Sequence, residues 1–389
     1  MEKSFEDILG SLSNIREKAQ ELREILLANL VMAGEIPAPT FEEEERIEFL
    51  MNRFKEAEIT KNSVDEVGNG IGIIEGNISE DNILIVAHAD TVFNAKVDHT
   101  IQIQPESVSG AGVADNSLGI AVLATLPIIL EKMDIQLNHN LILMGASRSL
   151  GRGNLEGLRF FLSNFNQPIK AGIGLEGVEL GRLSHTSIGM KRGEIVCRVP
   201  EEYDWSRFGD ASAILTLNEV INHINELRLP QRPRTSVVMG SIEGGSSFNT
   251  TALNAKLQFE IRSESSDMVQ DLHQSMEEIV SEVSSRSGDT INLDIFAQRE
   301  PGGISFSHPL VRRTRRIMDQ LKIKPRPGPS TSELSAFIDK DIPAITLGLT
   351  HGDNIHETNE SIEIEPIYTG IAQIIGTLLA IDGGYCEED

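Results

Sequence analysis

Apolar residues recur every three or four positions at the start of the chain. From Ile8 to Leu26 they follow a spacing that places them on one face of an α-helix, so a helix is predicted over residues 1–33. The turn Ile36-Pro37-Ala38-Pro39 should end it, because proline does not continue a helix. Thr40 is then predicted to cap a second helix, whose early acidic residues suit the positive end of the helix dipole.

Short apolar runs alternate with helical patterns after this point. Residues 83–87, 140–144 and 171–175 are predicted strands, and residues 117–130 and 154–162 are predicted helices. Such alternation predicts an α/β fold with a mostly parallel mixed sheet flanked by helices. A ligand site in such a sheet is expected at the carboxyl ends of the strands.

The pattern changes near Lys191-Arg192-Gly193. A strand, a long helix, two strands of alternating polarity and another helix follow, and this order is typical of an open-faced α+β sandwich. The first pattern returns after Pro301-Gly302-Gly303. We therefore predict a discontinuous main domain, residues 1–190 and 303–389, and an inserted lid or dimerisation domain, residues 191–302.

Composition narrows the class of protein. The chain has 389 residues and a formal net charge of −25, which disfavours binding to nucleic acid or to an anionic membrane by long-range repulsion. Its two cysteines, Cys197 and Cys386, form no metal-binding pair along the chain. The first residues lack a secretory signal pattern, and no run of about 18 apolar residues occurs. A cytoplasmic protein is expected.

Two motifs carry candidate metal chemistry. His88-Ala89-Asp90 follows an apolar strand, where the aspartate can fix the tautomer of a metal-bound imidazole. Asp115 ends the pattern Gly110-x-Gly112-x-x-Asp115. Taken alone, the first also fits a surface histidine beside a solvated acid, and the second also fits a glycine loop with a helix-capping aspartate.

Together with Glu176 and His356, in this order and at these separations, the motifs resemble the M20 family of metallopeptidases. That family includes carboxypeptidase G2-like, peptidase T-like and succinyl-diaminopimelate desuccinylase-like enzymes. The resemblance extends from Ile36 to the last predicted helix, Ile364 to Ile381. It implies a two-metal exopeptidase-like fold in which His88, Asp115 and Glu176 bind one metal and Asp90 orients His88. Asp115 would bridge to a second metal held by His356, with His351 as the alternative.

The same resemblance implies residues on the substrate side. Arg262 would hold a substrate carboxylate. Gly244, Gly245 and Asn249 would line the same pocket, with Asn249 reaching across a homodimer. The segment Ser330-Thr331-Ser332-Glu333 matches the loop of small residues that closes over the substrate.

The chain departs from the family where the chemistry occurs. The family places a Glu-Glu pair, a base and a metal ligand, 34 residues beyond the bridging aspartate, and this count gives Ser149 and Leu150. A slip of one residue gives Arg148 and Ser149, so neither register restores a carboxylate. Glu156 lies in the next predicted helix and should point elsewhere. The family's oxyanion-stabilising histidine falls at Tyr203, whose hydroxyl can still donate a hydrogen bond.

These losses limit the metal load and the chemistry. A general base contributes about 10²–10⁴-fold to rate. His88, Asp115 and Glu176 provide three ligands, enough for one zinc ion, whereas His356 and the shared Asp115 are too few for a second. At most one zinc per chain is therefore expected. If no metal binds, a cation must offset the carboxylates, and the candidates are Arg148, Arg152 and Lys191.

Three functions remain compatible with the sequence. The first is an active exopeptidase or deacylase with a mononuclear site. The second is a pseudoenzyme that binds a peptide or N-acyl amino acid through Arg262 and Asn249. The third is a structural homologue whose inserted domain serves protein contacts. We favour the second, because the catalytic groups are lost together while the substrate-side residues remain.

Overall fold

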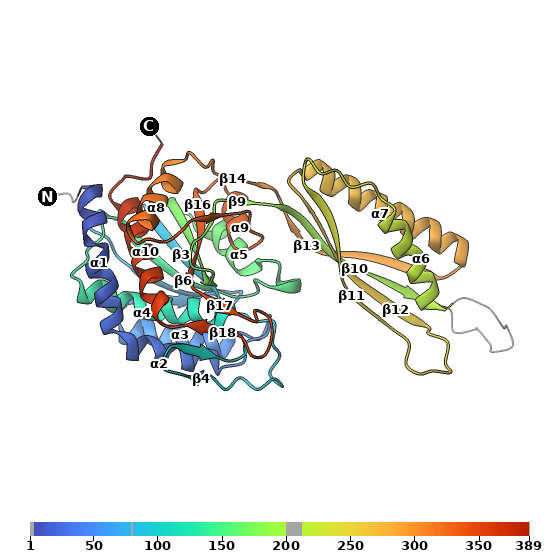
Figure 1. Ribbon diagram of the computed structural model, residues 1–389, viewed down its shortest axis with the longest axis horizontal. Helices are drawn as coiled ribbons and strands as arrows, with labels where there is room; N and C mark the ends of the chain where they lie inside the picture. Colours follow the sequence, from blue (N-terminus) through green and yellow to red (C-terminus); the bar gives the residue numbers. More distant parts are fainter. Residues whose placement is uncertain (1–3, 79–80, 200–211, 389) are drawn as a thin grey trace. The chain divides into compact units, whose positions relative to one another are not determined.

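The computed structural model describes residues 4–78, 81–199 and 212–388. Contacts divide the chain into two compact units (Figure 1). The first, which we call the main unit, comprises Met1–Ser187 and Gly303–Asp389. The second, the inserted unit, comprises Ile188–Gly302.

A mixed sheet of eight strands forms the centre of the main unit within the described residues, in the order β1-β2-β6-β3-β7-β16-β8-β15. Its central strands β6, β3, β7 and β16 run parallel, whereas β2 and β8 are antiparallel to their inner neighbours. The predicted α/β class with a mostly parallel mixed sheet is confirmed. The strands are β1 (Lys61–Val64), β2 (Gly70–Ile74), β3 (Asn82–His88), β6 (Asn140–Ala146), β7 (Ile169–Val178), β8 (Arg182–Ser184), β15 (Arg326–Pro327) and β16 (Ala344–Thr350).

Helices cover both faces of this sheet, because successive strand side chains point to opposite sides. Ile83 and Ile85 of β3 pack into the core formed with α1, α2, α3, α4, α8 and α10, whereas Leu84 and Val86 pack with α5 and α9. The helices are α1 (Phe5–Glu21), α2 (Arg23–Gly34), α3 (Glu44–Glu56), α4 (Leu118–Lys132), α5 (Glu156–Asn164), α8 (Pro309–Gln320), α9 (Leu334–Ile338) and α10 (Glu365–Asp382).

Two details of the N-terminal helices differ from the prediction. The predicted first helix is divided at Leu22 into α1 and α2, although both halves bury the same apolar stripe. Thr40 does not cap the next helix, since α3 begins at Glu44 with Glu43 before it. The Thr40 hydroxyl instead donates a 2.8 Å hydrogen bond to Oδ2 of Asp90, so this side chain serves the candidate site.

The inserted unit is an open-faced sandwich. Its sheet has the order β11-β12-β10-β13, and the helices α6 (Ala213–Asn225) and α7 (Ser266–Ser287) bury one face with residues such as Leu217 and Met276. The strand β13 was not predicted, although Ile291, Leu293 and Ile295 alternate with polar residues there. The strands are β10 (Gly189–Arg198), β11 (Thr235–Gly244), β12 (Asn254–Ser263) and β13 (Thr290–Arg299).

Smaller elements complete the main unit. The strands β4 (Gln102–Ile103), β5 (Ser107–Ser109), β17 (Gly352–Asp353) and β18 (Ser361–Glu363) form a second sheet. Short segments are β9 (Thr186–Ser187), β14 (Gly302–Gly303), η1 (Val113–Ser117) and η2 (Gly151–Gly153). The helical stretch Val113–Lys132 is long and apolar enough to cross a membrane, but 89% of its apolar segment is buried in the fold, as expected of a core helix.

Candidate metal centre

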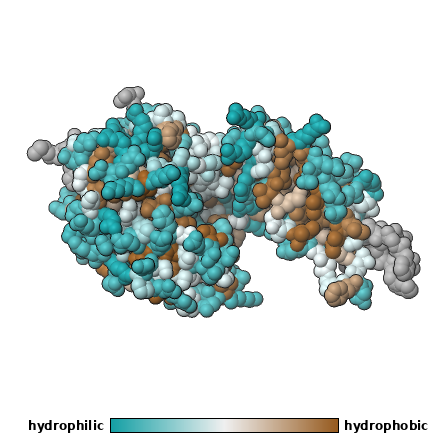
Figure 2. All heavy atoms as spheres, in the orientation of Figure 1, coloured by the Kyte–Doolittle hydropathy of each residue, from teal (hydrophilic) through white to brown (hydrophobic). Residues whose placement is uncertain are grey.

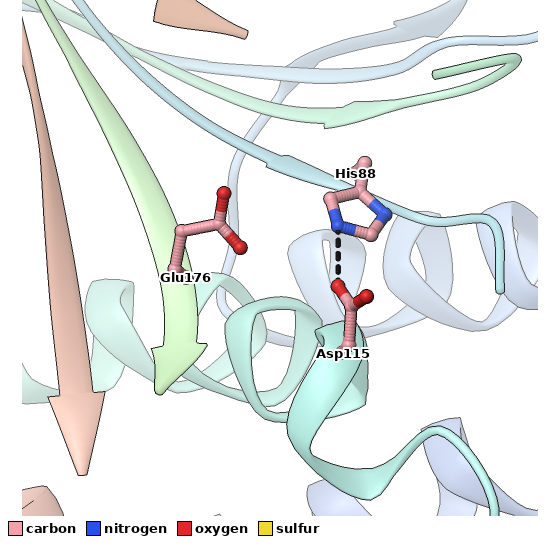
Figure 3. A group of neighbouring side chains, drawn as sticks. All are labelled: His88, Asp115 and Glu176. Carbon is pink, nitrogen blue, oxygen red and sulfur yellow. Dashed lines mark hydrogen bonds and ion pairs between the residues drawn. The ribbon is translucent and has the colours of Figure 1, made fainter. Parts of the chain in front are cut away.

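Three predicted metal ligands lie together at the carboxyl edge of the main sheet. His88 ends β3, Glu176 lies near the end of the neighbouring β7, and Asp115 is carried by η1 before α4. One ligand atom from each lies within 4.8 Å of the other two, and Figure 3 shows the Glu176 carboxylate directed toward the other two side chains. This arrangement follows from the strand order, since adjacent parallel strands end at the same edge.

Asp115 is placed between two histidines. Its Oδ1 lies 3.0 Å from Nε2 of His88, and its Oδ2 lies 3.0 Å from Nε2 of His356. The two oxygens of one carboxylate thus face two imidazoles, as a bridging ligand requires. His351, the alternative to His356, is exposed and lines a different cavity with Arg16.

The protonation of these groups reflects their mutual contacts. Burial would lower the pKa of His88, but hydrogen bonds to Asp115 and Asp90 raise that pKa well above its usual value. Burial also opposes ionisation of Asp115, yet its contacts with His356 and His88 keep the Asp115 pKa low. Burial raises the pKa of Glu176 to about 7. Protons thus compete with a metal ion for these ligands.

Asp90 connects His88 to the segment that lacks the expected acids. Nδ1 of His88 lies 3.0 Å from the Asp90 carbonyl oxygen and 3.3 Å from Oδ1 of its carboxylate. The other carboxylate oxygen, Oδ2, accepts hydrogen bonds from the N–H groups of Ser149, at 3.0 Å, and Leu150, at 2.7 Å. Asp90 is fully buried. The carboxylate therefore orients the imidazole and the loop together.

The loop itself brings no carboxylate to the cluster. Ser149 is buried, and its hydroxyl has no hydrogen-bond partner among the described residues. Leu150 is half-buried. Glu156 is paired with Arg148, 2.8 Å from its Nη1, so this nearest acid is already engaged outside the ligand cluster.

Glu360 was not foreseen as part of the site. This fully buried carboxylate accepts hydrogen bonds from the N–H groups of Ala114 at 2.9 Å, Asp115 at 3.3 Å and His356 at 2.8 Å. It thereby ties the turn that carries one candidate ligand to the segment that carries another. No short sequence motif links residues so far apart in the chain, so only the fold reveals this role.

Two further charged groups adjoin the cluster. Nη1 of Arg182 lies 3.9 Å from Oε1 of Glu176. Glu333 is buried, and its Oε1 has no hydrogen-bond partner among the described residues. The negative charge of Glu333 contributes to raising the pKa values of both His88 and Glu176. The Ser330-Thr331-Ser332-Glu333 motif pointed to this loop, whereas no motif pointed to Arg182.

The three cations proposed as metal substitutes have different surroundings in the structure. Arg148 pairs with Glu156, as described above. Lys191 belongs to the inserted unit, where its Nζ contacts Gln270 at 2.6 Å and Nδ1 of His273 at 3.0 Å. Arg152 lies in the turn η2. Nη1 of Arg182, which was not among these candidates, lies 3.9 Å from Oε1 of Glu176, and the replacement of a metal by a cation stays a prediction.

Most of the predicted substrate-side residues belong to the inserted unit. Arg262 lies on β12, where its Nε contacts Glu260. Gly244 ends β11, and Gly245 has a φ of 73°, which favours glycine. Asn249 is exposed and accepts a 3.1 Å hydrogen bond from the Ser247 hydroxyl. Their roles stay predictions.

The remaining predicted residues are one loop of the main unit and Tyr203. The N–H of Ser330 donates to the Thr186 carbonyl at 2.8 Å, and its hydroxyl lies 2.7 Å from that of Ser332. Thr331 lies between the two serines and is half-buried. This loop leads into Glu333. Tyr203 lies outside the described residues.

Comparisons with known proteins agree with this architecture. Residues 209–287 match the model of the peptidase dimerisation domain of the M20 family. The [LysW]-lysine/[LysW]-ornithine hydrolase of Saccharolobus islandicus is 22% identical over 301 residues, which cover 76% of this chain and 80% of that protein.

Two solved structures superpose over most of their length. The di-peptidase Dug1p of Saccharomyces cerevisiae has a TM-score of 0.79 at 13% identity, covering 96% of this chain and 98% of Dug1p. The M20 family metallo-carboxypeptidase Sso-CP2 of Sulfolobus solfataricus has a TM-score of 0.74 at 14% identity, covering 92% and 99%. This chain has the fold of the M20 metallopeptidases. The resemblance stated from the sequence motifs is confirmed, and the M20 dimerisation domain lies in the inserted unit.

Proposed function

We propose that this M20 homologue binds a peptide or an N-acyl amino acid at a site with one metal ion, and that its hydrolytic activity is impaired. The observation that carries this proposal is the combination of an intact ligand cluster, His88, Asp115 and Glu176, with a neighbouring loop that has no carboxylate. The cluster supports metal binding. The side chains of Ser149 and Leu150 cannot accept the proton of an attacking water as a glutamate would.

The donor set fits zinc. One imidazole and two carboxylates within 4.8 Å of one another match the three N/O ligands of many catalytic zinc sites, which leave a further position open. A zinc ion bound there would polarise a carbonyl oxygen and lower the pKa of a bound water. His356 and Asp115 offer only two ligands for a second ion. Asp90 would hold His88 in the required tautomer.

Substrate recognition is proposed from the relatives and from the inserted unit. The relative from Saccharolobus islandicus is named as a [LysW]-lysine/[LysW]-ornithine hydrolase, and the two structural relatives are named as a di-peptidase and a metallo-carboxypeptidase. We propose a carboxylate-bearing peptide or acyl amino acid as the ligand. The relatives' names describe hydrolases of this general kind, and the family resemblance implies that Arg262 and Asn249 contact such a ligand. We place this function in the cytoplasm.

A homodimer through the inserted unit belongs to this proposal. The strand β11 lies at the edge of its sheet and is largely exposed. Hydrophobic residues gather on the face of this unit drawn in Figure 2. Large apolar side chains of the unit that are exposed include Leu215, Val238, Ile242 and Phe248. An open edge with apolar neighbours is suited to pairing with a second copy.

Metal analysis and a turnover panel test the proposal together. Elemental analysis of the purified protein should give at most one zinc-class ion per chain, and His88→Ala should remove it. Dipeptides and N-acyl amino acids should bind to the metal-loaded protein without appreciable hydrolysis. Two tightly bound ions, or turnover at an ordinary kcat of roughly 1–10³ s⁻¹, would contradict it.

Glu333 supports a second candidate function, an active deacylase or exopeptidase with a mononuclear site. Its buried carboxylate has an oxygen without a partner among the described residues, and its charge acts on both His88 and Glu176. Such a group can replace the missing base. If the natural protein does hydrolyse an amide, Glu333→Gln should remove that activity while zinc content stays the same.

A further inference from the structure

The guanidinium of Arg182 has hydrogen-bond donors that its single described contact leaves available. It begins β8, shortly after β7 has carried Glu176 to the edge of the sheet. Its Nη1 lies 3.9 Å from Oε1 of Glu176, and its side chain remains 33% exposed. Among the described residues, no hydrogen bond joins this guanidinium to another group. Its N–H donors therefore have capacity for a further hydrogen-bond acceptor.

The simplest alternative is that Arg182 only neutralises Glu176. Its charge does oppose the effect of burial on the pKa of Glu176. However, an arginine dedicated to one carboxylate usually forms two parallel hydrogen bonds of about 2.7–2.9 Å, and the separation here is 3.9 Å. A metal bound by Glu176 would itself neutralise that carboxylate, leaving the guanidinium with its five N–H donors.

Other arginines are less suitable as an anchor beside the metal centre. Arg148 forms its ion pair with Glu156. Arg262, the anchor implied by the family, belongs to the inserted unit, where it and Arg192 both contact the Glu260 carboxylate. Arg182, by contrast, belongs to the main unit, and its contact with Glu176 places it beside a candidate metal ligand.

We propose that Arg182 binds the carboxylate of an N-acyl amino acid, or of the C-terminal residue of a peptide, whose amide carbonyl lies at the metal centre. In these compounds only three bonds separate the amide carbonyl carbon from the carboxylate carbon. A ligand whose carbonyl lies among His88, Asp115 and Glu176 therefore presents its carboxylate within one side chain of that cluster. Arg182 occupies that distance on the Glu176 side.

This inference rests on the proposed function and assigns the carboxylate of the ligand to Arg182 in place of the family-implied Arg262. A guanidinium matches the planar geometry of a carboxylate, so the acid should bind better than a neutral amide of the same shape. The preference for the acid is the property to be measured, and it does not require turnover.

Calorimetric titration of the zinc-loaded protein with N-acetylalanine and N-acetylalaninamide tests the proposal. The natural protein should bind the acid about tenfold or more tightly than the amide, as expected for a charge-assisted contact. Arg182→Gln should abolish this difference, and Arg182→Lys should retain part of it. Arg326→Gln is the matched control, because Arg326 is the register partner of Arg182 on β15 and should leave the preference intact.

Each other outcome has a defined meaning. Equal binding of acid and amide by the natural protein, or an unchanged preference in Arg182→Gln, overturns the inference alone. Loss of the preference in Arg262→Gln but not in Arg182→Gln assigns the carboxylate to Arg262 and also overturns it. Loss of zinc from Arg182→Gln would mean that the residue acts by holding Glu176, again against the proposal. If neither compound binds, the proposed function fails and this inference fails with it.

Discussion

The N–H of Leu150 donates a 2.7 Å hydrogen bond to Oδ2 of Asp90. This contact fixes the backbone of the loop whose side chains depart from the family pattern. Because the adjacent Ser149 N–H binds the same oxygen, the loop is held beside His88 by main-chain groups that any residue type provides. The side chains of Ser149 and Leu150 can therefore be changed without removing the main-chain contacts that anchor this loop.

Restoring the acids should restore metal capacity. We predict that Ser149→Glu combined with Leu150→Glu raises the metal content from one ion toward two per chain, since a further ligand then joins His356 and Asp115. Ser149→Glu alone should do less. The Ser149 side chain is buried, so an unpaired carboxylate there should lower the Tm of the metal-free double variant, and zinc should recover it. Elemental analysis and calorimetry measure both effects.

The matched control for this series is Ser149→Gln with Leu150→Gln, which has the same shape and no charge. It should gain no metal. Equal metal content in the two double variants would contradict the predicted register. Tyr203→His extends the series, because the family places its oxyanion-stabilising histidine there, and weak amide hydrolysis is the readout for that variant.

Asp90 should matter both for stability and for metal binding. Asp90→Asn keeps the shape but removes the charge that accepts from Thr40, Ser149 and Leu150. We predict a loss of about 1–3 kcal/mol in the free energy of unfolding and zinc binding weaker by about 10–100-fold. Urea denaturation and competition with a zinc chelator measure these. Thr40→Val removes one contact only, so a larger effect from Thr40→Val would count against this role.

We predict that Asn116 links two candidate metal ligands, its neighbour Asp115 and Glu176. Its Nδ2 donates to the Leu175 carbonyl at 2.8 Å, and its Oδ1 accepts from the N–H of Gly177 at 3.0 Å. Asn116→Ala leaves these buried groups unpaired, so we predict a loss of about 2–4 kcal/mol in stability together with weaker zinc binding.

Asn29→Ala provides the comparison for that prediction. Asn29 is also buried and bonds to Thr125 at 3.0 Å, in the α2–α4 contact. It should lower the free energy of unfolding without a specific change in zinc affinity of the folded protein. If both variants weaken zinc binding equally, the effect is one of general stability and the coupling through Asn116 is wrong.

The exposed edge of the inserted unit should form a homodimer. Light scattering at tens of micromolar is expected to give twice the mass of one chain. Ile242→Glu, on the edge strand β11, should shift the mass toward that of a monomer, because a charge would be buried at the interface. Val64→Glu, at an exposed position of the main unit, should not. A natural protein that is monomeric at this concentration contradicts the prediction.

Periodicity predicted most of the main unit because its strands are short apolar runs and its helices have one apolar face. It failed where local signals were ambiguous. Nothing in the spacing from Ile8 to Leu26 marks the break at Leu22, since the apolar stripe continues through it. Thr40 has the residue type of a helix cap but bonds to Asp90. The strand β13 was not predicted, although its apolar residues alternate with polar ones.

Site residues could be predicted from the sequence where they belong to a short motif or to the order of motifs in the family. His88 and Asp115 stand in recognisable local patterns, and the family order supplied Glu176 and His356. Glu360 and Arg182 could not be found in this way, because their proximity arises from the fold. Glu360 is far from η1 in the sequence but accepts hydrogen bonds from its backbone. Arg182 lies on β8, and the chain folds so that its guanidinium is close to Glu176 on β7. Contacts that arise only from the fold cannot be recognised from the spacing of residues along the chain.

The pairing of β7 with β16 also determines when the main unit can be completed during synthesis. Gly172 on β7 is aligned with Ala344 on β16, and the whole inserted unit lies between them in the chain. A ribosome that has released only the first half of the protein leaves β7 with an unpaired edge, and His356 and Glu360 do not yet exist. Closing so long a loop is slow relative to local folding. The inserted unit, whose strands and helices are contiguous, can therefore fold first, and the metal centre forms among the last parts of the molecule.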